Sequence, residues 1–152
     1  MNSFNLKKYF ETAKKQPWYQ NTIFVITGDH TNEAYYKEYK NSVDAFALPL
    51  IIYSPNPKYQ LQGIRKDIAQ QIDIYPTLAD LIGYDKPIRS WGKSLISDKE
   101  NEEVVPNSLA EEDQFIIGDY IYRFDRKDIV GIYQKTDLEL KKNLLHKLHT
   151  PE

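Results

Sequence analysis

Hydrophobic residues recur at helical spacing near the start of the chain. Residues 4–15 place Leu6, Phe10 and Ala13 about one helical turn apart among lysines and glutamates. This spacing predicts an amphipathic helix with one apolar face. Pro17 follows, and because proline disfavours a helical conformation in the residue before it, we expect the helix to end there.

Two near-continuous apolar runs follow the helix, at residues 22–27 and 45–53. Continuous apolarity, in place of alternation, is typical of strands that are covered on both faces, as in a parallel sheet. Pro49 lies inside the second run, so that strand is expected to start near Leu50. We expect the two runs to lie side by side in one mostly parallel sheet.

A second helical pattern spans residues 67–82, where Ile72, Leu78 and Ile82 fall on one face. We expect this apolar stripe to pack on the sheet. Pro76 inside the pattern predicts a kink or two helical pieces.

The last part of the chain changes character to short strands and turns. A Gly-Asp pair at Gly118 separates two short apolar runs and predicts a tight hairpin. The expected elements are strands at 114–117, 120–124 and 128–134, and an amphipathic helix at 137–147.

These elements together predict the fold class α/β. A partial, mostly parallel sheet with flanking helices is followed by a small antiparallel C-terminal sheet and a helix. We expect a domain boundary between residues 1–95 and 96–152.

Composition narrows the function classes. The 152 residues carry a net charge of −2 and no cysteine. A disulfide scaffold and a cysteine nucleophile are therefore excluded, and so is a basic nucleic-acid-binding protein of the usual kind. No run of residues has the length and apolarity of a membrane span, and residues 1–10 lack the apolar core of a signal peptide.

Asp29 and His30 are the candidate chemical residues, because they come directly after the first apolar run. Ligands of open α/β sheets bind beyond the carboxyl ends of the strands. A carboxylate and an imidazole together suit a divalent metal ion, and Gly28 permits the backbone turn that brings both to one site. The alternative is that Asp29 caps the following segment and His30 is a surface loop residue.

Several segments in one order carry a family resemblance. TIFVITGDHT, ALPLIIYSP, QQIDIYPTLADLIGY and SWGKSL resemble the C-terminal half of the sulfatase-type domain of the alkaline phosphatase superfamily. The likeness is greatest to the lipoteichoic-acid-synthase-like phosphoglycerol transferases of bacteria. The resemblance implies an alkaline-phosphatase-like half-domain in which Asp29 and His30 bind a catalytic divalent metal ion, whether Mn, Zn, Mg or Ca.

The same resemblance implies the substrate class and the location. The substrate would be a phosphate or sulfate ester, lipid-linked or part of a glycan, and the parent protein would be extracytoplasmic and membrane-anchored. Nucleic acid is not an expected partner.

The chain departs from the family pattern at the nucleophile. Family members carry a Thr, Ser or modified Cys nucleophile near the start of the domain, but the Cys-x-Pro-x-Arg signature is absent here and none of Thr27, Thr31 and Ser54 occupies the matching place. We therefore expect a C-terminal fragment of a larger enzyme, inactive alone, whose partner is the missing N-terminal half. Uncovered strand edges would favour self-association. The alternative function is a non-catalytic homologue that binds an anionic glycan or a protein partner.

Overall fold

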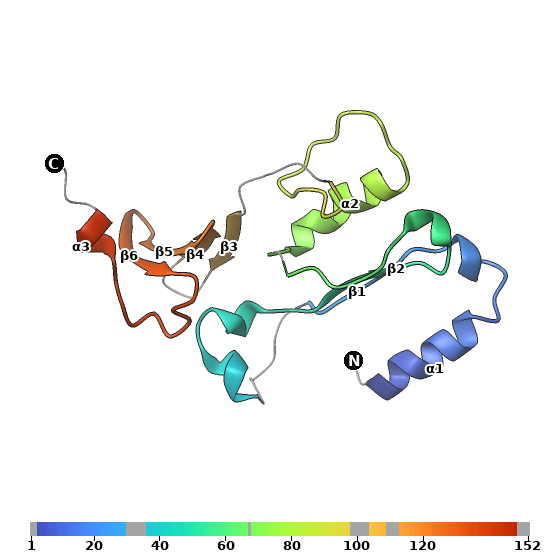
Figure 1. The fold of residues 1–152 in the computed structure, drawn as a ribbon, viewed down its shortest axis with the longest axis horizontal. Helices are drawn as coiled ribbons and strands as arrows, with labels where there is room; N and C mark the ends of the chain where they lie inside the picture. The colour runs from blue at the N-terminus through green and yellow to red at the C-terminus, as the bar shows by residue number, and fades with distance from the viewer. Residues whose placement is uncertain (1–2, 30–35, 67, 98–103, 109–112, 149–152) are drawn as a thin grey trace. The chain divides into compact units, whose positions relative to one another are not determined.

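The computed structural model describes residues 3–29, 36–66, 68–97, 104–108 and 113–148 (Figure 1). The chain divides into two compact units. The first comprises Met1–Gly28 and Pro49–Arg65, and the second comprises Asp29–Leu48 and Lys66–Glu152. Each unit is built from two separate stretches of sequence, and the boundary expected after residue 95 stays a prediction.

The first unit combines a helix with a pair of strands. Its helix confirms the amphipathic pattern of residues 4–15. The elements are α1 (Ser3–Ala13), the 3₁₀ turn η1 (Tyr19–Asn21), β1 (Phe24–Thr27), β2 (Leu50–Tyr53) and the 3₁₀ turn η4 (Pro57–Tyr59).

Aromatic side chains form the core of the first unit. Phe24 is buried together with Ala13 and Tyr19. Its ring lies 5.0 Å from that of Phe10 on α1 and stacks at 5.9 Å on Tyr53 of β2. Such aromatic pairs add to the stabilisation that burial of apolar area provides, so the helix and both strands share one core.

β1 and β2 pair with each other as predicted, but they run antiparallel, with Phe24 opposite Tyr53 and Thr27 opposite Leu50. The predicted parallel direction of this pair is therefore not confirmed. Of the residues in these two strands only Phe24 is buried, and Ile51 is 47% exposed, so the expected cover on both faces is not seen either. The direction of a strand pair depends on the connection between the strands. In the described part of that connection the elements are the 3₁₀ turns η2 (Lys37–Lys40) and η3 (Asp44–Phe46), with no α-helix of the kind that joins parallel strands.

The second predicted helix is shorter than its sequence pattern and buries a different face. The 3₁₀ turn η5 (Gln71–Asp73) leads into α2 (Ile74–Leu81). Pro76, Thr77 and Ala79 are buried, whereas Ile72 is 45% and Ile82 is 65% exposed. The expected burial is therefore wrong for Ile72 and Ile82, whereas Leu78 is half-buried. Polar contacts of Asp73 and Thr77 turn their own side of the helix inward.

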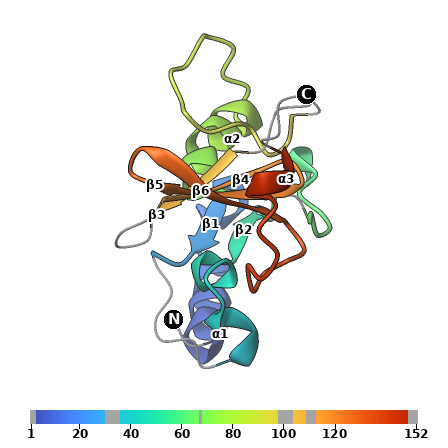
Figure 2. The same ribbon diagram turned by 90° about the vertical axis from the view of Figure 1, so that its left-hand side faces the viewer.

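A four-stranded antiparallel sheet follows in the second unit (Figure 2). The tight turn at Gly118, with a positive φ of 56°, joins its two central strands as predicted. The strand with proline at position 106 was not predicted, because proline and polar residues mask its pattern; it lies at the sheet edge, where proline is tolerated. The strands in sheet order are β3 (Val104–Ser108), β4 (Asp113–Ile117), β5 (Tyr120–Asp125) and β6 (Asp128–Gln134).

One face of this sheet forms the core of the second unit. Ile116, Ile121 and Tyr133 lie opposite one another on neighbouring strands and are buried. Val43 and Ile68 pack against them from other parts of the same unit. The sheet therefore organises residues from both stretches of the second unit.

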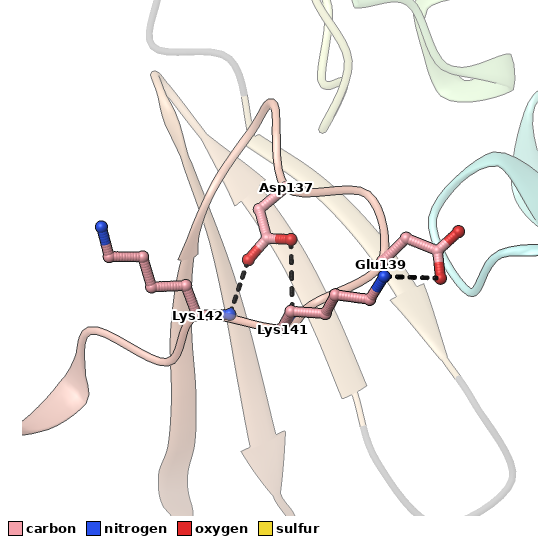
Figure 3. Close-up of polar contacts among 4 residues, drawn as sticks. All are labelled: Asp137, Glu139, Lys141 and Lys142. Atoms are coloured by element: carbon pink, nitrogen blue, oxygen red, sulfur yellow. Dashed lines mark hydrogen bonds and ion pairs between the residues drawn. The ribbon is translucent and has the colours of Figure 1, made fainter.

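The helix predicted at residues 137–147 is wrong over most of its length, since α3 spans only Leu145–Leu148. The Asp137 carboxylate instead accepts hydrogen bonds from the backbone N–H groups of Lys141 and Lys142, at 3.2 and 2.8 Å (Figure 3). Leu140 adopts a positive φ of 51°, which a helix does not allow. An aspartate side chain that binds nearby backbone groups competes with the helix in this way.

The segment that follows β6 is hydrogen-bonded to the edge of that strand, mainly through the side chain of Asn143. Asn143 Oδ1 accepts hydrogen bonds from the backbone N–H groups of Ile132 and Leu145, and its Nδ2 donates to the Val130 carbonyl. The Leu144 N–H also donates to the Ile132 carbonyl at 2.7 Å. These bonds satisfy backbone groups at a sheet edge that would otherwise stay open.

Candidate functional site

The candidate site begins where β1 ends. Along β1, exposure changes from the buried Phe24 to the exposed Thr27, so the strand leaves the core as it approaches Gly28. Asp29 follows in a bend of the backbone and is exposed. Of the two residues proposed as metal ligands, the structure thus places Asp29 at an accessible position directly after a strand. His30 lies outside the described residues.

The described residues do not complete a metal site by themselves. Within the described ranges, no three His, Cys, Asp or Glu side chains lie close enough to hold an ion together. A zinc-like ion needs about four ligands, of which three or more usually come from protein. Asp29 therefore fits a site only as one contributor among several.

The hydroxyl groups near the strand ends are engaged with the backbone. Ser54 Oγ donates to the Thr22 carbonyl at 2.8 Å, and Thr27 Oγ1 donates to the Gly28 carbonyl at 3.3 Å. A nucleophilic hydroxyl requires a base or a metal beside it, and these two make structural bonds instead. Thr31 lies outside the described residues. The bonds of Ser54 and Thr27 are those of hydroxyls that stabilise turns and strand ends.

A second polar arrangement, missed from the sequence, links η5 and α2 to the segment at residues 93–95. The Asp73 side chain is 1% exposed, and its two oxygens accept the backbone N–H groups of Gln70 and Lys93, both at 2.8 Å. Thr77, fully buried, accepts the Leu95 N–H at 2.9 Å and donates to the Asp73 carbonyl. These contacts use the Asp73 carboxylate structurally, so it is not a candidate metal ligand.

Gly92 makes this arrangement possible because the backbones approach very closely there. A Cβ on residue 92 would lie 2.2 Å from the Ile72 carbonyl oxygen. Only glycine fits at that distance. The signal in the sequence was the Gly-Lys-Ser-Leu turn at residues 92–95, together with an Asp and a Thr four residues apart at the start of a helix.

One tyrosine in the first unit has a displaced pKa. The Tyr19 and Tyr53 hydroxyls are 2.9 Å apart. This hydrogen bond, together with burial, raises the pKa of Tyr19 from its usual 10 to about 12. The shift comes mainly from the hydrogen bond with Tyr53, so we interpret Tyr19 as a structural partner of Tyr53.

The lengths of the described helices show whether one of them could span a membrane. The longest helix among them is α1, with 11 residues. Within the described ranges, no helix combines the length and apolarity needed to cross a bilayer.

Comparison with known proteins identifies relatives in one family. The sulfatase family model matches residues 3–84, more than half of the chain. Phosphoglycerol transferase I of Citrobacter koseri is 27% identical over 107 residues, which cover 68% of this chain and 13% of that protein. The lipoteichoic acid synthase-like protein YvgJ of Bacillus subtilis is 29% identical over 132 residues, 77% of this chain and 21% of that protein. The chain thus spans about a fifth or less of these curated relatives, and no solved structure matches it.

Proposed function

This chain belongs to the sulfatase family, and from that premise we propose that it forms part of a metal-dependent enzyme acting on phosphate or sulfate esters. The observation that carries the proposal is the family match over residues 3–84, which includes β1 and the Asp29–His30 pair directly after it. Two relatives are named phosphoglycerol transferase I and lipoteichoic acid synthase-like protein. Their names favour phosphoglycerol transfer within this class of reactions.

In this proposal Asp29 and His30 supply two of about four ligands to a divalent metal ion. The exposure of Asp29 supports the assignment, because a ligand at the end of a strand has to be accessible to the ion and the substrate. A carboxylate and an imidazole accommodate Mn, Zn or similar ions, and a carboxylate also suits Mg and Ca. When bound, such an ion neutralises negative charge that develops on the ester oxygens.

The nucleophile and the remaining ligands are assigned to polypeptide outside these 152 residues. The proposal is supported by the lengths of the relatives, of which the chain covers 13% and 21%. It is also supported by the exposed apolar side chains of Ile72, Tyr75 and Ile82, which offer a surface on which the other half of the domain would pack. We propose an extracytoplasmic location for the complete enzyme, on the basis of the family resemblance.

The test uses the complete product of the gene that encodes this chain. Hydrolysis of aryl phosphate and aryl sulfate, and release of phosphoglycerol from phosphatidylglycerol, are measured with Mn, Zn, Mg or Ca added in turn. The variants are Asp29→Ala and His30→Ala, and the matched control is Asp85→Ala, which removes an exposed carboxylate elsewhere. We expect metal-dependent turnover that both site variants lose by about a thousandfold or more and that the control retains.

Full turnover in the Asp29→Ala, His30→Ala double variant would refute the ligand assignment. If the unchanged gene product turns over none of these esters with any of the four metals, the enzymatic proposal is wrong. The non-catalytic alternative, binding of an anionic glycan or a protein partner, would then take its place.

A further inference from the structure

One tryptophan side chain is almost completely exposed to solvent. Trp91 is 99% exposed, and among the large hydrophobic side chains of the described residues only Ile64, at 94%, approaches that value. The other tryptophan, Trp18, is 45% exposed and contacts the Phe24 ring. Leaving a whole indole in water forgoes the stabilisation that its burial provides. Exposure of this degree therefore calls for a partner.

The backbone next to Trp91 is held firmly. Gly92 lies against the Ile72 carbonyl, so closely that no larger residue fits, and its N–H donates to Ser90 Oγ at 3.0 Å. Directly beyond it, the Lys93 N–H is bound by the buried Asp73 carboxylate. These contacts fix the position of the backbone that carries the Trp91 indole. Binding through such a preorganised group loses less conformational entropy.

The sequence around Trp91 is basic. Residues 86–96 contain Lys86, Arg89 and Lys93 and no acidic residue, in a chain whose net charge is −2. Lys86 and Arg89 are exposed. Asp85 precedes the segment, and Asp80 binds Ser94 Oγ at 2.7 Å. When these two carboxylates are counted with the three cations, the local net charge is still positive. A positive charge is complementary to an anionic partner.

We propose that residues 86–96 bind the surface of an anionic lipid bilayer, with Trp91 inserted at the level of the headgroups and Lys86 and Arg89 at the lipid phosphates. Tryptophan is enriched at the membrane–water interface because its ring is apolar and its N–H is polar. Basic side chains near an anionic leaflet add electrostatic attraction. The combination of one aromatic anchor with flanking cations is that of a protein lying on a membrane.

The flanking charges distinguish this surface from the one on α2. Ile72, Tyr75 and Ile82 are exposed, and the two charged residues between them are acidic: Asp73, which is buried, and Asp80, which accepts a hydrogen bond from Ser94 Oγ. No cation accompanies these three side chains. Trp91 has Arg89 and Lys93 two positions to either side. Lysine is depleted in protein interfaces, whereas lipid headgroups accept both the indole and the cations. The inference does not depend on the metal site or on catalysis.

Vesicle flotation of the 152-residue protein tests the proposal. Binding to vesicles of equal parts phosphatidylcholine and phosphatidylglycerol is compared with binding to pure phosphatidylcholine. The variants are Trp91→Ser and Lys86→Gln/Arg89→Gln, and the matched control is Lys14→Gln/Lys15→Gln, which removes two exposed lysines from the first unit. A Trp18→Phe protein, which retains Trp91 as its only tryptophan, reports insertion by its fluorescence.

We expect binding to the anionic vesicles and a blue shift of Trp91 emission on binding. Trp91→Ser should weaken binding about tenfold or more, and each neutralised cation about fivefold, while the lysine control binds as the unchanged protein does. Circular dichroism confirms that each variant is folded.

Four results would overturn the proposal. The first is absence of binding to anionic vesicles, and the second is equal binding by Trp91→Ser. The third is equal binding of soluble poly(glycerol phosphate) without a shift of Trp91 emission, which would identify a soluble anionic polymer as the partner. The fourth is a dimer in sedimentation that Trp91→Ser dissociates, which would identify a second copy of the chain. Because none of these measurements uses turnover, they stay separate from the test of the metal site.

Discussion

Asp73 and Lys93, twenty positions apart in the sequence, are joined by a 2.8 Å hydrogen bond from the Lys93 backbone N–H to Asp73 Oδ1. The same carboxylate accepts the Gln70 N–H through its other oxygen. A buried carboxylate is costly unless its oxygens are bonded, and here both are. The pair therefore determines which face of α2 turns inward and where the 93–95 segment lies.

Removal of the Asp73 carboxylate should destabilise the second unit. Asp73→Ala leaves the Gln70 and Lys93 N–H groups without their acceptor, and hydrogen bonds to a charged group contribute about 1.5–3 kcal/mol each. We expect a loss of about 2–4 kcal/mol in the free energy of unfolding, measured by urea denaturation. Asp85→Ala, at an exposed position, is the control and should change stability by less than about 0.5 kcal/mol. Equal effects of the two substitutions would contradict this role for Asp73.

A methyl group at position 92 should be poorly tolerated. In Gly92→Ala the new Cβ would lie 2.2 Å from the Ile72 carbonyl oxygen, so the backbone has to move. Overpacking of this kind costs about 1–3 kcal/mol. Gly63→Ala is the comparison, because its Cβ meets no atom within 4 Å and only its positive φ of 92° is strained. We expect Gly92→Ala to expose the Lys93 and Leu95 amides to hydrogen exchange and Gly63→Ala to leave them protected.

Local patterns predicted the elements better than their orientation. Gly118 between two apolar runs was sufficient to predict the hairpin, because the turn residue and the strand pattern are adjacent in sequence. The face of α2 was predicted wrongly, because the burial of Asp73 and Thr77 depends on partners twenty and eighteen positions away. Hydrophobic spacing contains no information about such distant polar partners.

The same limit applies to the C-terminal helix and to the site. Asp137 lies in a helical pattern, but its side chain binds the Lys141 and Lys142 N–H groups and ends that pattern. For the site, the resemblance selected Asp29 and His30, and the structure places Asp29 at an exposed bend. Their pairing around an ion stays a prediction, because His30 lies outside the described residues and no three potential ligands lie together within them.

Asn143 should be required to hold the C-terminal segment on β6. Asn143→Ala removes the acceptor of the Ile132 and Leu145 N–H groups and the donor to the Val130 carbonyl. With about 1 kcal/mol for each of these three hydrogen bonds, we expect a loss of about 3 kcal/mol in the free energy of unfolding. The Ile132 amide should also exchange faster with solvent. Lys142→Ala, which leaves these three bonds in place, is the control, and an equal loss in that variant would contradict the role of Asn143.

The Tyr19–Tyr53 pair should make stability depend on alkaline pH. The pKa of Tyr19 is about 12 in the folded protein and about 10 in the unfolded chain. Between these values the unfolded state loses its proton while the folded state keeps it, so unfolding becomes more favourable as pH rises. The contribution of Tyr19 should be fully present below pH 10 and be lost between about pH 10 and 12.

Denaturation at several pH values tests this expectation. Tyr19→Phe and Tyr53→Phe should each lose less stability between pH 10 and 12 than the unchanged protein does. Tyr9→Phe, which removes an exposed tyrosine of the same unit, should follow the unchanged protein. If all four proteins show the same pH dependence, the shift of the Tyr19 pKa is not what makes stability fall.

The isolated 152-residue chain should bind a divalent ion only weakly through Asp29 and His30. Two ligands leave the other positions of the ion to water, and affinity rises with the number and charge of the ligands. We expect a dissociation constant for Mn²⁺ above about 0.1 mM by calorimetry, and weaker binding still in Asp29→Ala and His30→Ala. His146→Ala is the control, because it removes an exposed imidazole elsewhere in the chain. Since Asp29 is exposed, its substitution should change the free energy of unfolding by less than about 1 kcal/mol. Tight binding that survives both site substitutions would place the metal elsewhere in the chain, whereas a large loss of stability in Asp29→Ala would make Asp29 a structural residue.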